Sequence, residues 1–152
     1  SIRDAMRAGT LPKTLNYEVV GTDISPTALA QAKSARYCGV SAARGLNDAQ
    51  RKNYFRADEQ CIEVLPEYRT SVSFREFNLT KPFDLLGKFD VIFCRNVLIY
   101  FSQERKRDII ERFARSLNPG GVLFIGSTES MSDHGDLFEM RSLGGALIYL
   151  KR

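Results

Sequence analysis

The stretch that decides the fold is FDVIFCRNVLIYF, residues 89–101. Residues 89–94 are a nearly continuous apolar run, which is typical of a central parallel strand covered on both faces. Arg95 and Asn96 follow directly, so this strand would deliver them to its carboxyl end, where open α/β sheets bind ligands. An arginine just past a hydrophobic strand is costly unless it is paired. We therefore predict that Arg95 meets a carboxylate, from substrate, cofactor or protein; a structural salt bridge is the alternative.

The residues after this strand predict a turn and then a helix. Tyr100 lies five residues beyond Arg95, so its hydroxyl is placed to point back toward the same end of the strand. The alternative for Tyr100 is a core tyrosine with a satisfied hydroxyl. Residues 103–117 have the apolar spacing of an amphipathic helix, with Ser102 as its cap and residues 118–121 as its end.

Further elements alternate along the chain on both sides of this stretch. Strands are predicted at 17–22, 62–65, 72–77, 122–125 and 146–150, and helices at 2–6, 26–35, 48–55 and, as one turn, 136–140. Alternating strands and helices predict an α/β domain with a mostly parallel sheet. The connection between the strands at 122–125 and 146–150 is short and has the composition of a loop, so the final strand is predicted to be antiparallel.

Bulk composition fits one globular domain. The chain has 152 residues, 43% of them hydrophobic and 26% charged, with a net charge of +4 at pH 7. Basic residues are spread along the chain, and the densest run, at 104–108, also contains acids, which indicates a solvated helix face; docking of an acidic protein partner is the weaker alternative. No compact arginine patch with interleaved aromatics indicates nucleic-acid binding.

Cysteine and histidine content predicts no metal site. Cys38, Cys61 and Cys94 are odd in number and widely spaced, which fits neither a disulfide framework nor a zinc pattern, so a reduced cytosolic chain is expected. His134, in a polar stretch, has no partner histidine. No apolar run reaches the ~20 residues of a membrane span, and no signal peptide opens the sequence.

Two further strand ends carry polar side chains. Asp23 follows the strand at 17–22, where an acid can accept hydrogen bonds from both hydroxyls of a ribose. Its alternative role is that of an acid at a helix N-terminus, since Pro26 begins a helix just beyond. Asn78 and Leu79 follow the strand at 72–77, where asparagine can read an adenine edge and leucine can pack on its face; an ordinary turn is the alternative.

The string Cys94–Phe101 resembles the signature of CheR-type chemotaxis receptor methyltransferases. Supporting strings are found in order along nearly the whole chain: 21–25 (GTDIS), 54–55 (YF), 72–74 (VSF), 78–79 (NL), 118–121 (NPGG) and 126–130 (GSTES). The aspartate and Pro-Gly-Gly strings are shared with many methyltransferases. The segment from Arg95 to Tyr100 is the discriminating one.

This resemblance implies a Rossmann-like class I methyltransferase sheet that uses S-adenosylmethionine to esterify glutamates on the cytoplasmic helical region of chemotaxis receptors. By the resemblance, Asp23 would hold the ribose, and Asn78 and Leu79 the adenine. Arg95 would lie near the methyl donor and the incoming glutamate, and Asn96 and Tyr100 would shape the site. The protein would be cytoplasmic, without a metal, nucleic-acid partner or membrane insertion.

Two departures from the family carry further expectations. The sequence opens on residues resembling the helix after the family's glycine-containing loop, so we expect that loop, the first strand and the N-terminal helical domain to be absent and this helix to lack a cap. The strands ending at Asp23 and Arg95 would then have unpaired edges, which predicts self-association. The segment 56–60, where some members have a glycine-containing hairpin that grips a receptor tether, has no glycine, which favours a tether-independent enzyme.

Other classes of function compete with this one. A nicotinamide-dependent oxidoreductase also uses an acid at the position of Asp23, but the Arg95–Tyr100 string and the antiparallel last strand favour methyl transfer. A non-catalytic methyltransferase-like domain that binds a receptor or regulator is a second alternative. A nucleic-acid methyltransferase is disfavoured, because the sequence has no amide-Pro-Pro-aromatic motif.

Overall fold

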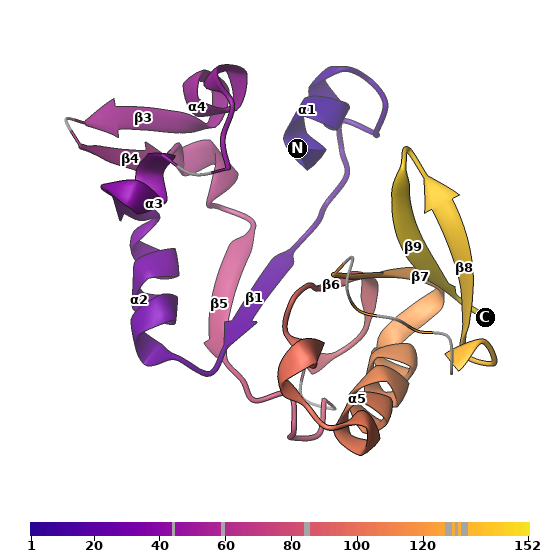
Figure 1. The fold of residues 1–152 in the computed structure, drawn as a ribbon. Helices are drawn as coiled ribbons and strands as arrows, with labels where there is room; N and C mark the ends of the chain where they lie inside the picture. Colours follow the sequence, from indigo (N-terminus) through magenta and orange to yellow (C-terminus); the bar gives the residue numbers. More distant parts are fainter. Residues whose placement is uncertain (44, 59, 84–85, 127–128, 130, 132–133) are drawn as a thin grey trace. The chain divides into compact units, whose positions relative to one another are not determined.

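The computed structural model describes residues 1–43, 45–58, 60–83, 86–126, 129, 131 and 134–152, without the side chains of 41 and 43. The chain divides into two compact units, Ser1–Asn78 and Leu79–Arg152, and each is described by itself. Each unit contains a parallel strand pair and at least one helix packed against it (Figure 1). The predicted α/β class is confirmed.

A pair of parallel strands forms the centre of the first unit. β1 (Val19–Asp23) runs alongside β5 (Val72–Glu76), and Asp23 lies opposite Glu76 at their carboxyl ends. Helix α2 (Pro26–Ser34) follows β1 and packs against both strands. The strands predicted at 17–22 and 72–77 are thereby confirmed.

Local sequence explains this strand–turn–helix segment. Ser25 caps α2 by accepting a hydrogen bond from the backbone N–H of Ala28, and Pro26 occupies the first helical turn, where its missing N–H costs nothing. Within β1, a Cβ on Gly21 would come within 2.7 Å of the Phe74 ring. Glycine at this position therefore lets the two strands pair without displacing that ring.

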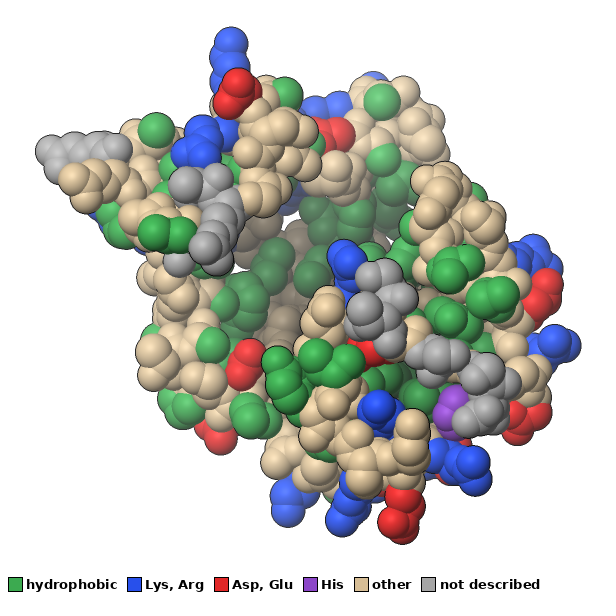
Figure 2. All heavy atoms as spheres, viewed as in Figure 1, with side chains coloured by type: hydrophobic (Ala, Val, Ile, Leu, Met, Phe, Trp, Pro, Cys, Tyr) green, Lys and Arg blue, Asp and Glu red, His purple; other side chains and the backbone are tan. Residues whose placement is uncertain are grey.

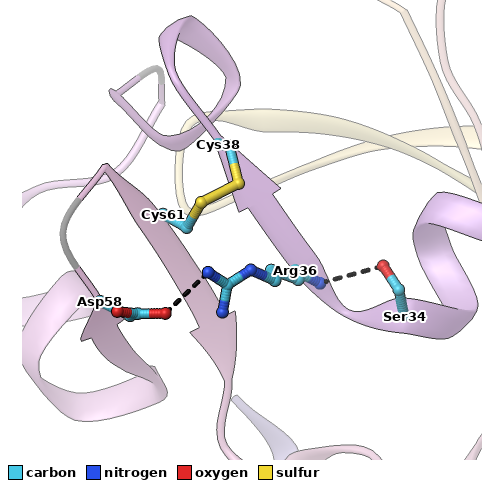
Figure 3. The surroundings of a disulfide bond; sticks show 5 residues. All are labelled: Ser34, Arg36, Cys38, Asp58 and Cys61. Atoms are coloured by element: carbon cyan, nitrogen blue, oxygen red, sulfur yellow. Dashed lines mark hydrogen bonds and ion pairs between the residues drawn. A yellow bond between two sulfur atoms is a disulfide. The ribbon is translucent and has the colours of Figure 1, made fainter.

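A small antiparallel sheet completes the first unit, and of its three strands the sequence predicted only the one at 62–65. Its strands are β2 (Arg36–Cys38), β4 (Cys61–Val64) and β3 (Phe55–Asp58), in the order β2-β4-β3. Cys38 lies directly opposite Cys61, with 4.0 Å between their Cα atoms, and the two form a disulfide (Figure 3). The expectation of a fully reduced chain is wrong, because the undetected strand β2 brings together two cysteines 23 residues apart in sequence.

Reduction of the Cys38–Cys61 bond is expected to lower the melting temperature. The bond closes a loop across 23 residues of sequence, and cross-links of this kind stabilise folded proteins by about 2–4 kcal/mol. Thermal unfolding with and without a phosphine reductant measures the shift. A variant with serine at both positions is the control, and it should melt at the same temperature in both buffers. An unchanged wild-type melting temperature on full reduction would contradict the prediction.

Short helices surround the two sheets of the first unit. They are α1 (Ile2–Arg7), α3 (Val40–Ala43), α4 (Asp48–Tyr54) and the 3-10 turn η1 (Pro66–Tyr68). Contrary to expectation α1 is capped, because Ser1 and Asp4 form a reciprocal capping box. The Asp4 carboxylate also accepts a hydrogen bond from the Tyr54 hydroxyl, and this bond is the main cause of the lowered pKa of Asp4.

The second unit is built on a four-stranded sheet in the order β6-β7-β9-β8. Its strands are β6 (Phe89–Cys94), β7 (Leu117–Ile125), β8 (Phe138–Leu143) and β9 (Ala146–Lys151). β6 and β7 are parallel, whereas β9 is antiparallel to both of its neighbours. The antiparallel last strand is confirmed.

The helical turn predicted at 136–140 is wrong, because β8 begins at Phe138 and pairs with β9. Gly144 and Gly145, at φ +57° and +80°, make the two-residue turn between these strands. Two adjacent positive φ values are what a tight hairpin turn requires. The Gly-Gly pair was therefore a hairpin signal in the sequence, and pairing with β9 overrode the local helical tendency.

Helix α5 (Gln103–Ser116) confirms the strongest periodicity in the sequence. Ile109, Ile110, Phe113 and Leu117 are all at most 4% exposed, and the helix packs against β7. The chain passes straight from α5 into β7 at Leu117, so residues 118–121 lie within the strand rather than forming a separate terminator. Near the end of the helix, Lys88 donates to the Arg115 carbonyl and Lys151 to the Leu117 carbonyl, which complements the partial negative charge there.

Three strands of the parallel pairs have an open edge within the described residues: β1 and β5 pair only with each other, and β6 pairs only with β7. Val91 and Phe93 on β6 are 45% and 71% exposed, so the expectation that β6 is covered on both faces is wrong. Self-association through the open edges of β1 and β6 stays a prediction.

The surface carries charges of both signs. Lysine and arginine side chains are interspersed with aspartate and glutamate on the face shown in Figure 2. Exposed hydrophobic side chains lie over the β8–β9 hairpin, where Met140, Leu143 and Leu147 are more than half exposed. Among the described residues, no helix has the length and apolar character needed to cross a bilayer.

Candidate functional site

Asp23 ends β1 with one carboxylate oxygen engaged. Its Oδ1 atom accepts a hydrogen bond of 2.8 Å from the backbone N–H of Ser25, the cap of α2, so the predicted role at a helix N-terminus is real. Within the described part of the chain, its Oδ2 atom has no hydrogen-bond partner, and the residue is exposed. The Asp23 carboxylate can therefore orient the turn and still accept a hydroxyl donor.

Asn78 lies at the same edge of the first unit as Asp23. The Asp23 carbonyl accepts from the Phe77 N–H at 2.9 Å, which extends the pairing of β1 and β5 to the residue just before Asn78. Asn78 is exposed, and Leu79, which begins the second unit, is half-buried. The structure thus places Asp23 and Asn78 at the carboxyl ends of neighbouring parallel strands, as the sequence predicted.

Arg95 and Asn96 follow β6 at its carboxyl end in the second unit, and both are exposed. Within the described residues, the Arg95 side chain makes no hydrogen bond or ion pair with the protein, so the structural salt bridge is not found there. Asn96 has a φ of +60°, a left-handed conformation uncommon for residues other than glycine. The backbone turns sharply immediately after Arg95.

Tyr100 ends the 3-10 turn η3 (Leu98–Tyr100) and is 81% exposed. The alternative of a core tyrosine is therefore wrong. Its neighbour Leu98 is only 2% exposed and anchors the turn in the core of this unit. The 3-10 turn thus combines a buried anchor with an accessible phenol.

Glu129 is a residue of this region to which the sequence gave no role. Its Oε2 atom accepts hydrogen bonds from the backbone N–H of Asn96 at 3.0 Å and of Gly126 at 2.6 Å. Burial, and secondarily the charge of Glu129, raise the pKa of the Cys94 thiol to about 12, so this buried cysteine is protonated at neutral pH. Glu129 belongs to the family string at 126–130, which pointed to this segment of the sequence. Its hydrogen-bond partner Asn96, however, lies 33 residues away in the sequence and could not be foreseen.

Two cavities lie away from the predicted site residues, one in each unit. One of about 460 Å³ in the first unit is lined by Arg3, Arg7, Lys13 and neighbouring residues; one of about 760 Å³ in the second unit is lined by Lys88, Arg112, Arg115 and others. Neither lining includes a predicted site residue.

Metal-ligating side chains do not gather in the part of the chain that the structure describes: no three histidine, cysteine, aspartate or glutamate residues are grouped to hold an ion. His134, in a polar stretch of the sequence, is 8% exposed.

Within each unit, the predicted site residues lie at the carboxyl ends of parallel strands, where open α/β sheets bind ligands. The chain belongs to the CheR methyltransferase family. The sequence model described as "CheR methyltransferase, SAM binding domain" matches residues 5–145, which span parts of both units. The family resemblance and its cofactor, S-adenosylmethionine, are thereby confirmed.

Relatives with similar sequences are chemotaxis methyltransferases. Chemotaxis protein methyltransferase Cher2 of Pseudomonas putida is 41% identical over 133 residues, covering 87% of this chain and 48% of its own length. Chemotaxis protein methyltransferase 1 of Vibrio cholerae is 40% identical over 144 residues, covering 94% and 51%. The chain spans about half the length of these relatives. Among solved structures, PKMT2 from Rickettsia typhi aligns with a TM-score of 0.46 at 22% identity, covering 71% of this chain and 16% of that one.

Proposed function

We propose that this chain is the cofactor-binding part of a methyltransferase that esterifies glutamate side chains on chemotaxis receptors. Membership of the CheR family supports methyl transfer, and the names of the relatives support a role in chemotaxis. The observation that carries the choice of an acidic substrate is Arg95, an exposed guanidinium at the end of β6 with no protein carboxylate bound to it among the described residues.

In this proposal Asp23, Asn78, Leu79, Arg95 and Asn96 hold S-adenosylmethionine. The Oδ2 atom of Asp23, which accepts no hydrogen bond from the described residues, suits a ribose hydroxyl. Exposed Asn78 with half-buried Leu79 suits an adenine edge and face. When bound, S-adenosylmethionine supplies a methyl group carried by a positively charged sulfur. The oxidoreductase alternative loses its support, because the family match is to a methyltransferase domain.

Arg95 and Tyr100 are the proposed catalytic residues. A glutamate side chain is already ionised at pH 7, so the reaction requires no general base. Arg95 would orient the carboxylate through two parallel N–H···O bonds, and Tyr100 would help to shape the site around it. Aligning the reacting oxygen and excluding water are then the main tasks of these side chains.

Titration of the chain with S-adenosylhomocysteine tests the proposal. Binding in the micromolar range is expected, since this compound presents the same adenosine and amino-acid groups without the transferable methyl. Failure of the folded chain to bind would favour the alternative of a methyltransferase-like domain that contacts a receptor or regulator without catalysis. Receptor methylation, with the glutamate site located by mass spectrometry, then tests the substrate.

Replacing Asp23 with alanine is expected to weaken S-adenosylhomocysteine binding by about 10- to 100-fold, because hydrogen bonds to a charged group contribute about 1.5–3 kcal/mol. Asp58→Ala is the matched control: this half-exposed aspartate pairs with Arg36 in the small sheet (Figure 3) and should leave the affinity unchanged. Equal affinity of Asp23→Ala and the wild type would remove Asp23 from the proposed site.

The proposed partner is the cytoplasmic helical region of the receptors, which places the enzyme in the cytoplasm. Tether-independent recognition also stays a prediction. The segment 56–60, where some family members have a glycine-containing hairpin, contains no glycine.

A further inference from the structure

We propose that Glu129 is a positioning residue for methyl transfer: its carboxylate fixes the backbone that carries Arg95. The inference rests on the proposed function of Arg95. Glu129 itself would touch neither the cofactor nor the glutamate substrate.

Glu129 continues the pairing of β6 with β7 beyond the last residues of the two strands. The final pair of their parallel ladder is Cys94 with Ile125. Just past that pair, a single carboxylate oxygen of Glu129 accepts from Asn96 and from Gly126. The side chain therefore ties the two strand ends together where backbone pairing has stopped.

The hydrogen bond from Asn96 to Glu129 holds the backbone turn that immediately follows Arg95. Asn96 adopts a φ of +60°, in the left-handed region that residues other than glycine occupy at some cost in free energy, asparagine less than most. The bond from its N–H to Glu129 offsets that cost. Because the Arg95 side chain has no partner among the described residues, its position depends on this backbone turn.

The surroundings of Glu129 leave little room for another arrangement. A Cβ on Gly126 would lie 2.6 Å from Glu129 Oε2 and 3.0 Å from the Asn96 nitrogen, so glycine is required for the close approach. The other oxygen, Oε1, is buried without a hydrogen-bond partner among the described residues. A buried carboxylate oxygen of this kind is costly, and the two charge-assisted bonds through Oε2 offset that cost.

The test compares Glu129→Ala and Glu129→Gln in this protein. NMR measures hydrogen exchange at the Asn96 and Gly126 amides, and a receptor methylation assay measures kcat and KM. Glu129→Ala should speed exchange at both amides at least tenfold and lower kcat about 10- to 100-fold, because small displacements of a positioned group cost rate steeply. KM and S-adenosylhomocysteine affinity should change less than threefold. Glu129→Gln keeps an acceptor oxygen and should restore most of both properties.

Three further variants separate this role from general damage. Glu111→Ala removes a half-exposed glutamate of α5 and should match the wild type in every measurement. Gly126→Ala should reproduce the loss of kcat, because the added methyl group would displace the Glu129 carboxylate. The double variant Gly126→Ala with Glu129→Ala should be no slower than Glu129→Ala alone, since both substitutions remove the same contact between Glu129 and the strand ends.

Unchanged amide exchange in Glu129→Ala would overturn the tie, and unchanged kcat with faster exchange would overturn its role in positioning Arg95. If the wild type transfers no methyl group to any receptor, the proposed function fails. The exchange measurement still decides the tie in that case.

Discussion

Arg95→Ala is expected to lower kcat for receptor methylation by about 100-fold or more, because an unaligned carboxylate loses the benefit of positioning. The affinity for S-adenosylhomocysteine should fall by a much smaller factor, because Asp23, Asn78 and Leu79 would still hold the adenosine part. Arg95 is exposed at the end of β6 and forms no ion pair with the protein among the described residues, so its removal leaves no buried charge behind. Single-turnover kinetics and calorimetric titration separate the two effects.

Two variants show whether the guanidinium itself matters. Arg95→Lys keeps the charge but not the planar pair of donors, so it should recover only part of the lost rate. Arg105→Ala removes another exposed arginine of the second unit, one whose side chain makes no ion pair in the described structure, and should behave as the wild type. Equal losses of turnover and of cofactor affinity in Arg95→Ala would contradict a role in orienting the substrate.

Leu123→Ala is expected to lower the free energy of unfolding by about 3–4 kcal/mol, the usual cost of a cavity at a fully buried leucine. Leu123 is 0% exposed in β7, where its backbone pairs with Ile92 on one side and Tyr149 on the other. Urea unfolding followed by circular dichroism measures the change.

Leu147→Ala is the control for this substitution. Leu147 lies on β9 of the same sheet but is 55% exposed, so its replacement should cost about 0.5 kcal/mol or less. Equal losses of unfolding free energy in Leu123→Ala and Leu147→Ala would contradict the assignment of Leu123 to the core.

The sequence alone predicted the features that depend on near neighbours. Ser25 and Pro26 begin α2, and Ser102 and the apolar spacing of residues 103–116 define α5, because capping and helical periodicity involve residues three or four positions apart. The family signature is a continuous string of residues, so its resemblance to the family could be recognised from the sequence. The strand ends were also predicted from the residues immediately around them. Asp23 and Arg95 directly follow strands whose composition identifies them.

Tertiary structure decided what depends on distant segments. The disulfide joins residues 23 apart, and it became visible only once β2 was paired with β4. β8 became a strand because β9 pairs with it across a Gly-Gly turn.

The tie through Glu129 shows the same limit at the candidate site. Local spacing identified Arg95 but not the residue that holds its backbone, since Glu129 reaches Asn96 across 33 positions. Such contacts leave no periodic pattern in the sequence, because their geometry exists only after β6 and β7 have paired in parallel and brought their carboxyl ends together.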